Sequence, residues 1–99
     1  RLEINLERET RSYRQEIDGM RMQMESLAKR VRMTRELVQV AQDRFRISEV
    51  ELESDRITLS QLMEARISLD HAKVKRLESI CDYIKIRNRY EEKILMKYE

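Results

Sequence analysis

The sequence predicts an all-α fold. We expect one long antiparallel helical hairpin (a two-stranded coiled coil), with helices over about residues 2–53 and 58–98 and a tight turn over residues 54–57. Three observations lead to this prediction. The 99 residues contain no proline and one glycine, whereas an average chain of this length carries roughly a dozen such residues. Apolar residues recur at alternating steps of three and four, and a helix-capping motif stands just past the middle of the chain.

The amino-acid composition also favours an all-α fold. A β-sandwich, a barrel or an α/β sheet needs many tight turns, and the residues that make them are missing. Charged residues make up 40% of the chain, apolar residues another 40% and aromatic residues 5%. This mixture suits long helices that bury a narrow seam rather than a thick globular core.

The first helix is predicted by a row of fourteen uncharged positions at heptad spacing. Because 40% of the chain is charged, such a row indicates a face packed along its whole length against a partner helix. Its members are Leu6, Thr10, Tyr13, Ile17, Met20, Met24, Leu27, Val31, Thr34, Val38, Ala41, Phe45, Ser48 and Leu52. A second row, formed by Met33, Leu37, Val40, Ile47 and Val50, predicts neighbours on both sides of the helix.

The second helix repeats this arrangement of one seam and one flanking stripe. The predicted seam is Leu62, Ala65, Leu69, Ala72, Arg76, Ile80, Tyr83, Arg87, Tyr90 and Ile94. The flanking stripe is Ile67, Val74, Leu77, Cys81, Ile84, Leu95 and Tyr98. The small side chains of Ala65 and Ala72 would let the partner helix approach closely near the turn.

The turn between the helices is predicted from capping chemistry. Thr58-Leu59-Ser60-Gln61 is a capping box with Thr58 as N-cap, and Ile57 and Leu62 supply the hydrophobic staple. The first helix should end near Ser54, with Asp55 in a left-handed conformation. So short a connection makes the helices antiparallel.

The antiparallel register follows from the position of the turn. It sets Val38 near Val74, Val31 near Cys81 and Ile17 near Leu95. Because the first helix is the longer one, residues 1–12 should overhang or fray.

Nothing in the sequence indicates a catalytic, cofactor or metal site, so we expect no enzymatic activity. His71 is the only histidine and lacks convergent ligands, which favours a solvent-facing side chain. The lone Cys81 on the flanking stripe is expected to pack as a small hydrophobic residue. Met20 and Met24 belong to the predicted seam rather than to a soft-metal site. The near balance of 21 Lys and Arg against 19 Asp and Glu argues against nucleic-acid binding.

Residues 37–95 resemble the TolC family of outer-membrane efflux channels. The resemblance begins with the Ala-x-x-x-aromatic spacing of Ala41 and Phe45 and continues through the turn Asp55-Arg56-Ile57-Thr58-Leu59 and the helix start at Ala65-Arg66. It ends in a returning helix with periodic alanine and a late Asp82-Tyr83 pair. At the turn, Asp55 stands where the family has glycine.

The resemblance implies a non-enzymatic role in export of small molecules or proteins. Channels of this family are homotrimers whose helical hairpins pack into a periplasmic α-barrel. The hairpin tips close the tunnel and meet a periplasmic adaptor protein, which links the channel to an inner-membrane pump. Each subunit of such a channel holds two hairpins, and residues 1–99 would be the lower part of the second, C-terminal one, in the periplasmic portion of a bacterial outer-membrane protein. Its partner-binding tip would be Glu53, Ser54, Asp55, Arg56, Ile57 and Thr58. Since the chain begins at Arg1 rather than Met, we expect it to be a piece of a longer protein.

Two alternatives stay open at this point. One is the coiled-coil hairpin of a periplasmic adaptor, which also docks through its tip. The other is a cytoplasmic coiled-coil scaffold without a role in transport, which predicts a stable dimer or four-helix assembly. The channel interpretation predicts only weak association of the isolated chain.

Overall fold

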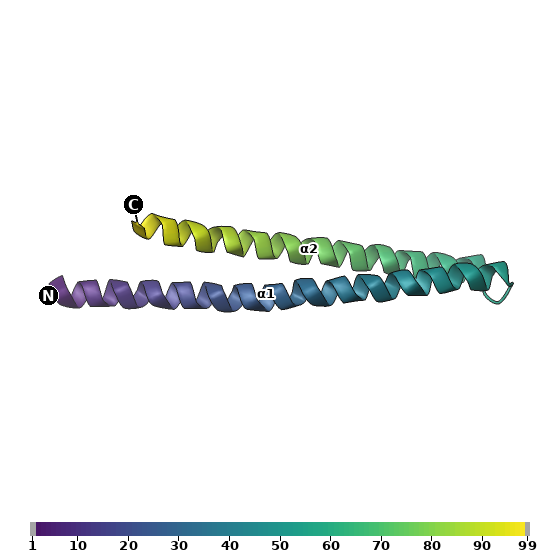
Figure 1. The fold of residues 1–99 in the computed structure, drawn as a ribbon, viewed down its shortest axis with the longest axis horizontal. Helices are drawn as coiled ribbons and strands as arrows, with labels where there is room; N and C mark the ends of the chain where they lie inside the picture. Colours follow the sequence, from purple (N-terminus) through teal and green to yellow (C-terminus); the bar gives the residue numbers. More distant parts are fainter. Residues whose placement is uncertain (1, 99) are drawn as a thin grey trace.

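The structure, a computed structural model that describes residues 2–98 and the side chains of residues 2–96, is an extended two-helix hairpin. Helix α1 (Leu2–Glu53) and helix α2 (Leu59–Tyr98) run antiparallel and give a molecule of 79 × 19 × 15 Å (Figure 1). The predicted all-α hairpin is therefore confirmed, with helix boundaries within a residue of those expected. Within the described residues, neither helix contains a segment long and apolar enough to cross a membrane.

The seam of α1 follows the predicted row from Tyr13 to Leu52. All twelve positions of this stretch are buried or half-buried, and Ile17 and Thr34 are the most enclosed, with 9% and 6% of their surface exposed. The two remaining members of the row, Leu6 and Thr10, are exposed because they lie near or beyond the end of α2. The heptad spacing thus identified the packed face of α1 correctly.

The seam of α2 keeps a strict alternation of three and four residues, and this overturns part of the prediction. Arg87, expected on the seam, is exposed. It forms an ion pair of 4.0 Å with Glu91 and lies over the Tyr83 ring instead. Besides Leu69, with 4% of its surface exposed, the buried positions of this seam are Ser79, with 3%, and Ile86, with 8%. The predicted row took two consecutive steps of four residues, from Ala72 to Arg76 and from Arg76 to Ile80. The helix instead steps by three from Arg76 to Ser79, so the predicted row left the packed face at Ile80.

Small side chains line the tip half of the hairpin on one of its broad faces. Thr34, Ala41 and Ser48 of α1 and Ala65, Ala72 and Ser79 of α2 border two adjoining hollows between the helices. We refer to this side of the molecule as the grooved face. The hydroxyls of Thr34 and Ser79 donate to carbonyl oxygens of their own helices, at 2.9 Å in each case, and are therefore satisfied without a bond across the seam.

The flanking stripes predicted from the sequence lie on the outside of the hairpin. We define the α1 stripe as Met33, Leu37, Val40, Ile47 and Val50. The α2 stripe comprises the predicted Ile67, Val74, Leu77, Cys81 and Ile84 together with Met63, which the sequence analysis did not include. All of these residues are exposed. Leu95 is 64% exposed, and the side chain of Tyr98 lies outside the described residues. Val74, Cys81 and Leu95 were expected to face α1. Along the hairpin axis they lie at about the expected positions, but their side chains point away from α1. Cys81 therefore does not pack inside the hairpin.

Polar contacts join the helices at the open end and fix their register. The Tyr13 hydroxyl donates to the Lys93 carbonyl oxygen at 3.4 Å, and the Lys93 Nζ lies 2.6 Å from the Glu16 carboxylate. Arg21 Nε donates to the Tyr90 hydroxyl at 3.1 Å, a hydrogen bond that raises the pKa of Arg21. These groups are exposed or half-exposed, so they orient the helix ends rather than contribute much stability.

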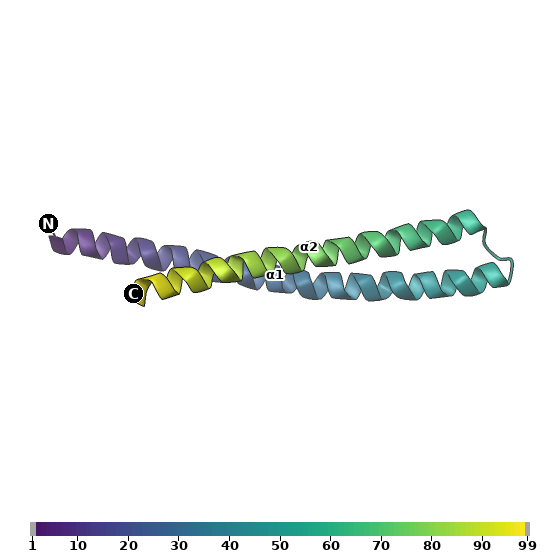
Figure 2. The ribbon, with the colours of Figure 1, turned by 90° about the horizontal axis from the view of Figure 1, so that it is seen from above.

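The N-terminal end of α1 extends past the end of α2, as the register predicted (Figures 1 and 2). The chain is helical from Leu2, and residues 2–10 are exposed. The overhang is therefore confirmed over the described residues as a continuous helix rather than a frayed one. Arg1, included in the prediction, lies outside them.

Candidate docking site at the hairpin tip

Backbone hydrogen bonds close the end of α1 in a Schellman motif. The Arg56 amide donates to the Glu51 carbonyl at 2.8 Å, and the Asp55 amide donates to the Leu52 carbonyl at 3.0 Å. Asp55 has a φ of 57°, the left-handed conformation that this motif requires and that the sequence predicted for this residue. The Ser54 amide and hydroxyl both donate to the Val50 carbonyl at 3.1 Å. The first half of the turn therefore has a fixed backbone.

A reciprocal capping box begins α2. The Thr58 amide donates to Gln61 Oε1 at 2.9 Å, and the Gln61 amide donates to Thr58 Oγ1 at 3.2 Å. Ile57 and Leu62, the predicted staple, are both half-buried. The predicted capping chemistry is confirmed at Thr58 and Gln61. As N-cap, Thr58 belongs to the connection, and α2 begins at Leu59.

The cap can be tested through stability. Thr58→Ala removes the hydroxyl that accepts from the Gln61 amide, so we expect the free energy of unfolding to fall by about 1 kcal/mol. Thermal unfolding followed by circular dichroism measures this loss. Ser60→Ala, two residues away and exposed, is the matched control and should change stability by less than about 0.5 kcal/mol. Equal stability of the two variants would contradict a working cap.

The side chains of the predicted tip site point mostly into solvent. Glu53, Ser54, Asp55, Arg56 and Thr58 are exposed, and Ile57 is half-buried. Neither Asp55 nor Arg56 forms an ion pair with another described residue. The structure thus brings the six predicted residues together on a rigid turn that presents an acid and a base side by side.

Apolar residues beside the turn extend this surface beyond the predicted set. Leu59 is 64% exposed, Val50 62% and Met63 55%. The sequence analysis assigned Val50 to a flanking row and did not single out Leu59 or Met63 for the tip. The sequence did contain a feature that could have placed Leu59 in this surface. Leu59 directly follows the N-cap, where an apolar side chain has no partner within its own helix. A mixed charged and apolar end is the composition expected of a protein-binding surface.

The other candidate positions lie away from the tip. His71 is exposed and borders the groove with Glu64 and Lys75. Among residues 2–98, no group of three His, Cys, Asp or Glu side chains is placed to hold a metal ion. Met20 and Met24 are half-buried in the seam, as predicted.

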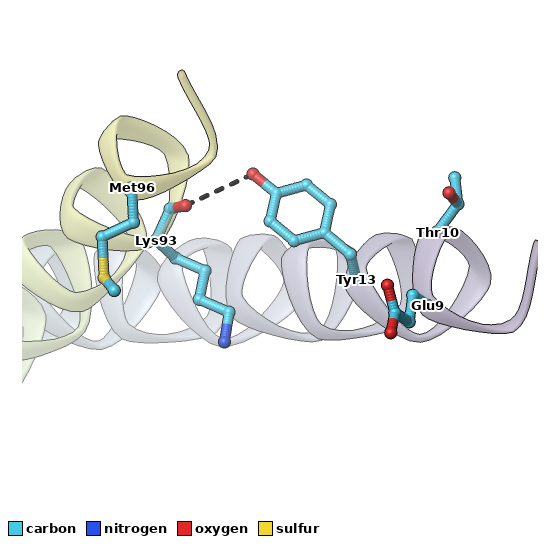
Figure 3. A pocket seen from close by; sticks show the side chains of 5 residues that line it. All are labelled: Glu9, Thr10, Tyr13, Lys93 and Met96. Carbon is cyan, nitrogen blue, oxygen red and sulfur yellow. Dashed lines mark hydrogen bonds between the residues drawn. The ribbon is translucent and has the colours of Figure 1, made fainter. Parts of the chain in front are cut away.

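Another hollow lies at the open end of the hairpin, away from the two of the grooved face. It is bordered by Glu9, Thr10, Tyr13, Lys93 and Met96 (Figure 3). The Tyr13 hydroxyl points across it to the Lys93 backbone. This hollow lies where α2 ends beside the longer α1 (Figure 1).

Comparison with known proteins finds no family, no curated protein and no solved structure that matches this chain.

Proposed function

We propose that this chain is a wall segment of a TolC-like efflux tunnel and that its tip docks a periplasmic adaptor protein. The observation that carries the proposal is the tip itself. Its backbone is closed by the Schellman motif and the capping box, while its charged and apolar side chains remain exposed. A turn whose backbone is already fixed is preorganised for a partner, because little backbone conformational entropy is lost on docking.

The placement of the two stripes also supports a wall segment. Met33, Val40 and Ile47 each precede a residue of the grooved face by one position, which puts the α1 stripe along the outer edge of that face. Ile67 and Val74 each stand two positions from the nearest seam residues, about 200° around the helix. The α2 stripe therefore faces away from α1. A hairpin with apolar residues on two different outer sides is suited to having a neighbour on each.

This distribution favours the proposal over a scaffold that forms a two-fold dimer. A two-fold dimer of hairpins buries the same surface on both copies. It would cover one stripe and leave the other in water. A segment flanked by other hairpins covers both.

The tip proposal is tested by charge reversal in the longer protein that contains this hairpin. Arg56→Glu should weaken co-purification of the adaptor roughly fivefold to tenfold. The tip would then present a second acidic side chain beside Asp55 in place of its one basic side chain, and a contact made by that basic side chain would become repulsive. Efflux of a fluorescent substrate should fall, or leak through the channel should rise, in parallel. Arg8→Glu, which makes the same change on the exposed overhang of α1, is the control and should leave all three readouts unchanged.

The outcomes separate the alternatives. Unchanged adaptor binding, efflux and leak in Arg56→Glu would reduce the turn to a helical connector and overturn the docking proposal. Co-purification of the longer protein with an outer-membrane channel, in place of an adaptor, would identify the chain as an adaptor hairpin. Export that proceeds normally without the gene would favour a scaffold.

A further inference from the structure

One seam position of α2 holds a charge that has no counter-ion. Arg76 is half-buried between Ala72 and Ser79, where the heptad alternation places it against α1. No acidic residue stands three or four positions from it on its own helix. It also forms no ion pair with any other residue that the structure describes. A partly desolvated cation without a partner costs free energy, so the packing of the hairpin alone does not explain Arg76.

The register places a second arginine across the seam from Arg76. Near the open end, Arg21 of α1 donates to the Tyr90 hydroxyl of α2 at 3.1 Å. Arg35 stands two heptads after Arg21, and Arg76 stands two heptads before Tyr90. Because the helices run antiparallel and pack with a heptad repeat, Arg35 and Arg76 occupy the same relative positions as the hydrogen-bonded pair. Arg35 also lacks an acidic residue three or four positions away on its helix.

A lysine joins the two arginines on the side of the hairpin opposite the grooved face. Arg35 stands two positions before Leu37, which borders the groove. Two positions rotate a helix by about 200°, so Arg35 lies on the other broad side, which we call the back face. Lys73 of α2 bears the same relation to Lys75, which also borders the groove. Lys73 stands one turn from Arg76 and adds a third positive charge.

The chain supplies no anion to these three residues, which we call the basic cluster. Asp70 stands three positions from Lys73, but its carboxylate is paired with Arg66 at 3.5 Å. Within the described part of the chain, no side chain of the basic cluster forms a hydrogen bond or an ion pair. Three cations thus stand together with their hydrogen-bond donors free.

We propose that the basic cluster of Arg35, Lys73 and Arg76 binds a phosphoryl group. Positive charges that face each other across a seam raise each other's energy, and an anion between them reverses the sign of the interaction. Each guanidinium presents a planar fork of N–H donors that matches two phosphate oxygens, and the Lys73 ammonium adds a point charge. A phosphoryl group carries about two negative charges near pH 7, so it neutralises more of the cluster than one carboxylate does. The source is a soluble phosphate compound or the phosphate of a lipid headgroup.

The first test is a titration of the ¹⁵N-labelled chain with inorganic phosphate at constant ionic strength, followed by NMR. We expect the side-chain Nε signals of Arg35 and Arg76 to shift. Three exposed charge-assisted contacts give a Kd on the order of 1 mM. Arg30 borders the groove on the other broad face, so its Nε signal should stay in place.

Substitutions with matched controls separate a site from general attraction between charges. Arg35→Gln should weaken phosphate binding about fivefold to tenfold, and because Arg35 is exposed the variant should fold normally. Arg30→Gln makes the same change on the grooved side and should alter the Kd by less than about twofold. Lys73→Gln and Lys75→Gln form a second such pair on α2. Equal weakening within each pair, or no Nε shift at all together with no binding to phosphate-bearing vesicles, would overturn the proposal.

Sedimentation with vesicles identifies the source of the phosphoryl group. The vesicles contain phosphatidylcholine with about one fifth phosphatidic acid, and phosphatidylcholine alone is the blank. Binding that Arg35→Gln removes and Arg30→Gln keeps would support the site with a lipid headgroup as ligand. Phosphate-dependent Nε shifts without vesicle binding would support it with a soluble phosphate compound. The proposal does not involve the turn, so none of these outcomes changes the expected effect of Arg56→Glu on adaptor binding.

Discussion

Leu69→Ala is expected to lower the free energy of unfolding of the hairpin by about 2 kcal/mol. Leu69 is only 4% exposed, the lowest value of any apolar side chain among the described residues. Removing a buried leucine loses its transfer free energy and leaves a cavity. The loss should fall near the lower end of the usual range, because two helices can close part of that cavity by moving together.

Thermal unfolding followed by circular dichroism at 222 nm should show this loss as a midpoint lower by roughly 8–16 °C. Leu77→Ala is the matched control on the same helix. Leu77 is 62% exposed, so its truncation should change stability by less than about 0.5 kcal/mol. The helix propensities of leucine and alanine enter both variants equally and cancel. A similar midpoint for the two variants would mean that the seam between α1 and α2 is not the main source of stability.

The second large effect is expected at Asp55, whose φ of 57° is unfavourable for most side chains. Asp55→Val places a β-branched residue in this conformation and should lower the free energy of unfolding by about 1–2 kcal/mol. Asp55→Gly removes the strain and should raise it by about 0.5 kcal/mol. The sign of the change therefore depends on the backbone rather than on any contact of the carboxylate.

Denaturation by urea of both variants measures this pair of opposite shifts. Arg56→Val is the control at the neighbouring position, where the backbone has no positive φ, and should change stability by less than about 0.5 kcal/mol. If Asp55→Val and Arg56→Val were equally stable, the left-handed turn would not persist in solution. The Schellman motif described at the end of α1 would then be wrong as well.

Local chemistry explains how much of this fold could be predicted from the sequence. The left-handed Asp55 and the Thr58–Gln61 capping box depend on residues within four positions of one another, so both could be inferred without the rest of the chain. The packed face of α1 could also be predicted from the sequence, because a row of uncharged positions stands out in a chain with so many charged residues. The register followed from these two results, since a short turn leaves one way to pair the helices.

The errors arose where apolar character and geometry disagree. Ile80 is more apolar than Ser79, and choosing it displaced the predicted seam and drew Arg87 into it. The helix buries Ser79 because strict heptad geometry places it opposite Thr34, and its hydroxyl is satisfied by its own backbone. Val74 and Cys81 were misplaced for a related reason, because an apolar stripe does not reveal whether its neighbour is the other arm or another molecule.

The docking role of the six tip residues stays a prediction, and for a physical reason. Their backbone conformation is determined within the chain, whereas the exposed charged side chains of Glu53, Asp55 and Arg56 form no ion pair with a described residue. The sequence of one partner alone does not contain the surface that such side chains would contact.

The charges around the turn have one more consequence, which concerns the helix dipoles. The C-terminal end of a helix carries partial negative charge and is stabilised by basic residues, yet the last turn of α1 contains Glu51 and Glu53 and no basic residue. The first turn of α2, whose partial positive charge favours acidic residues, has none. Both ends forgo an electrostatic stabilisation that a single substitution would supply. Residues that oppose local folding preferences tend to mark functional sites, and the proposed docking at the tip would account for this charge pattern.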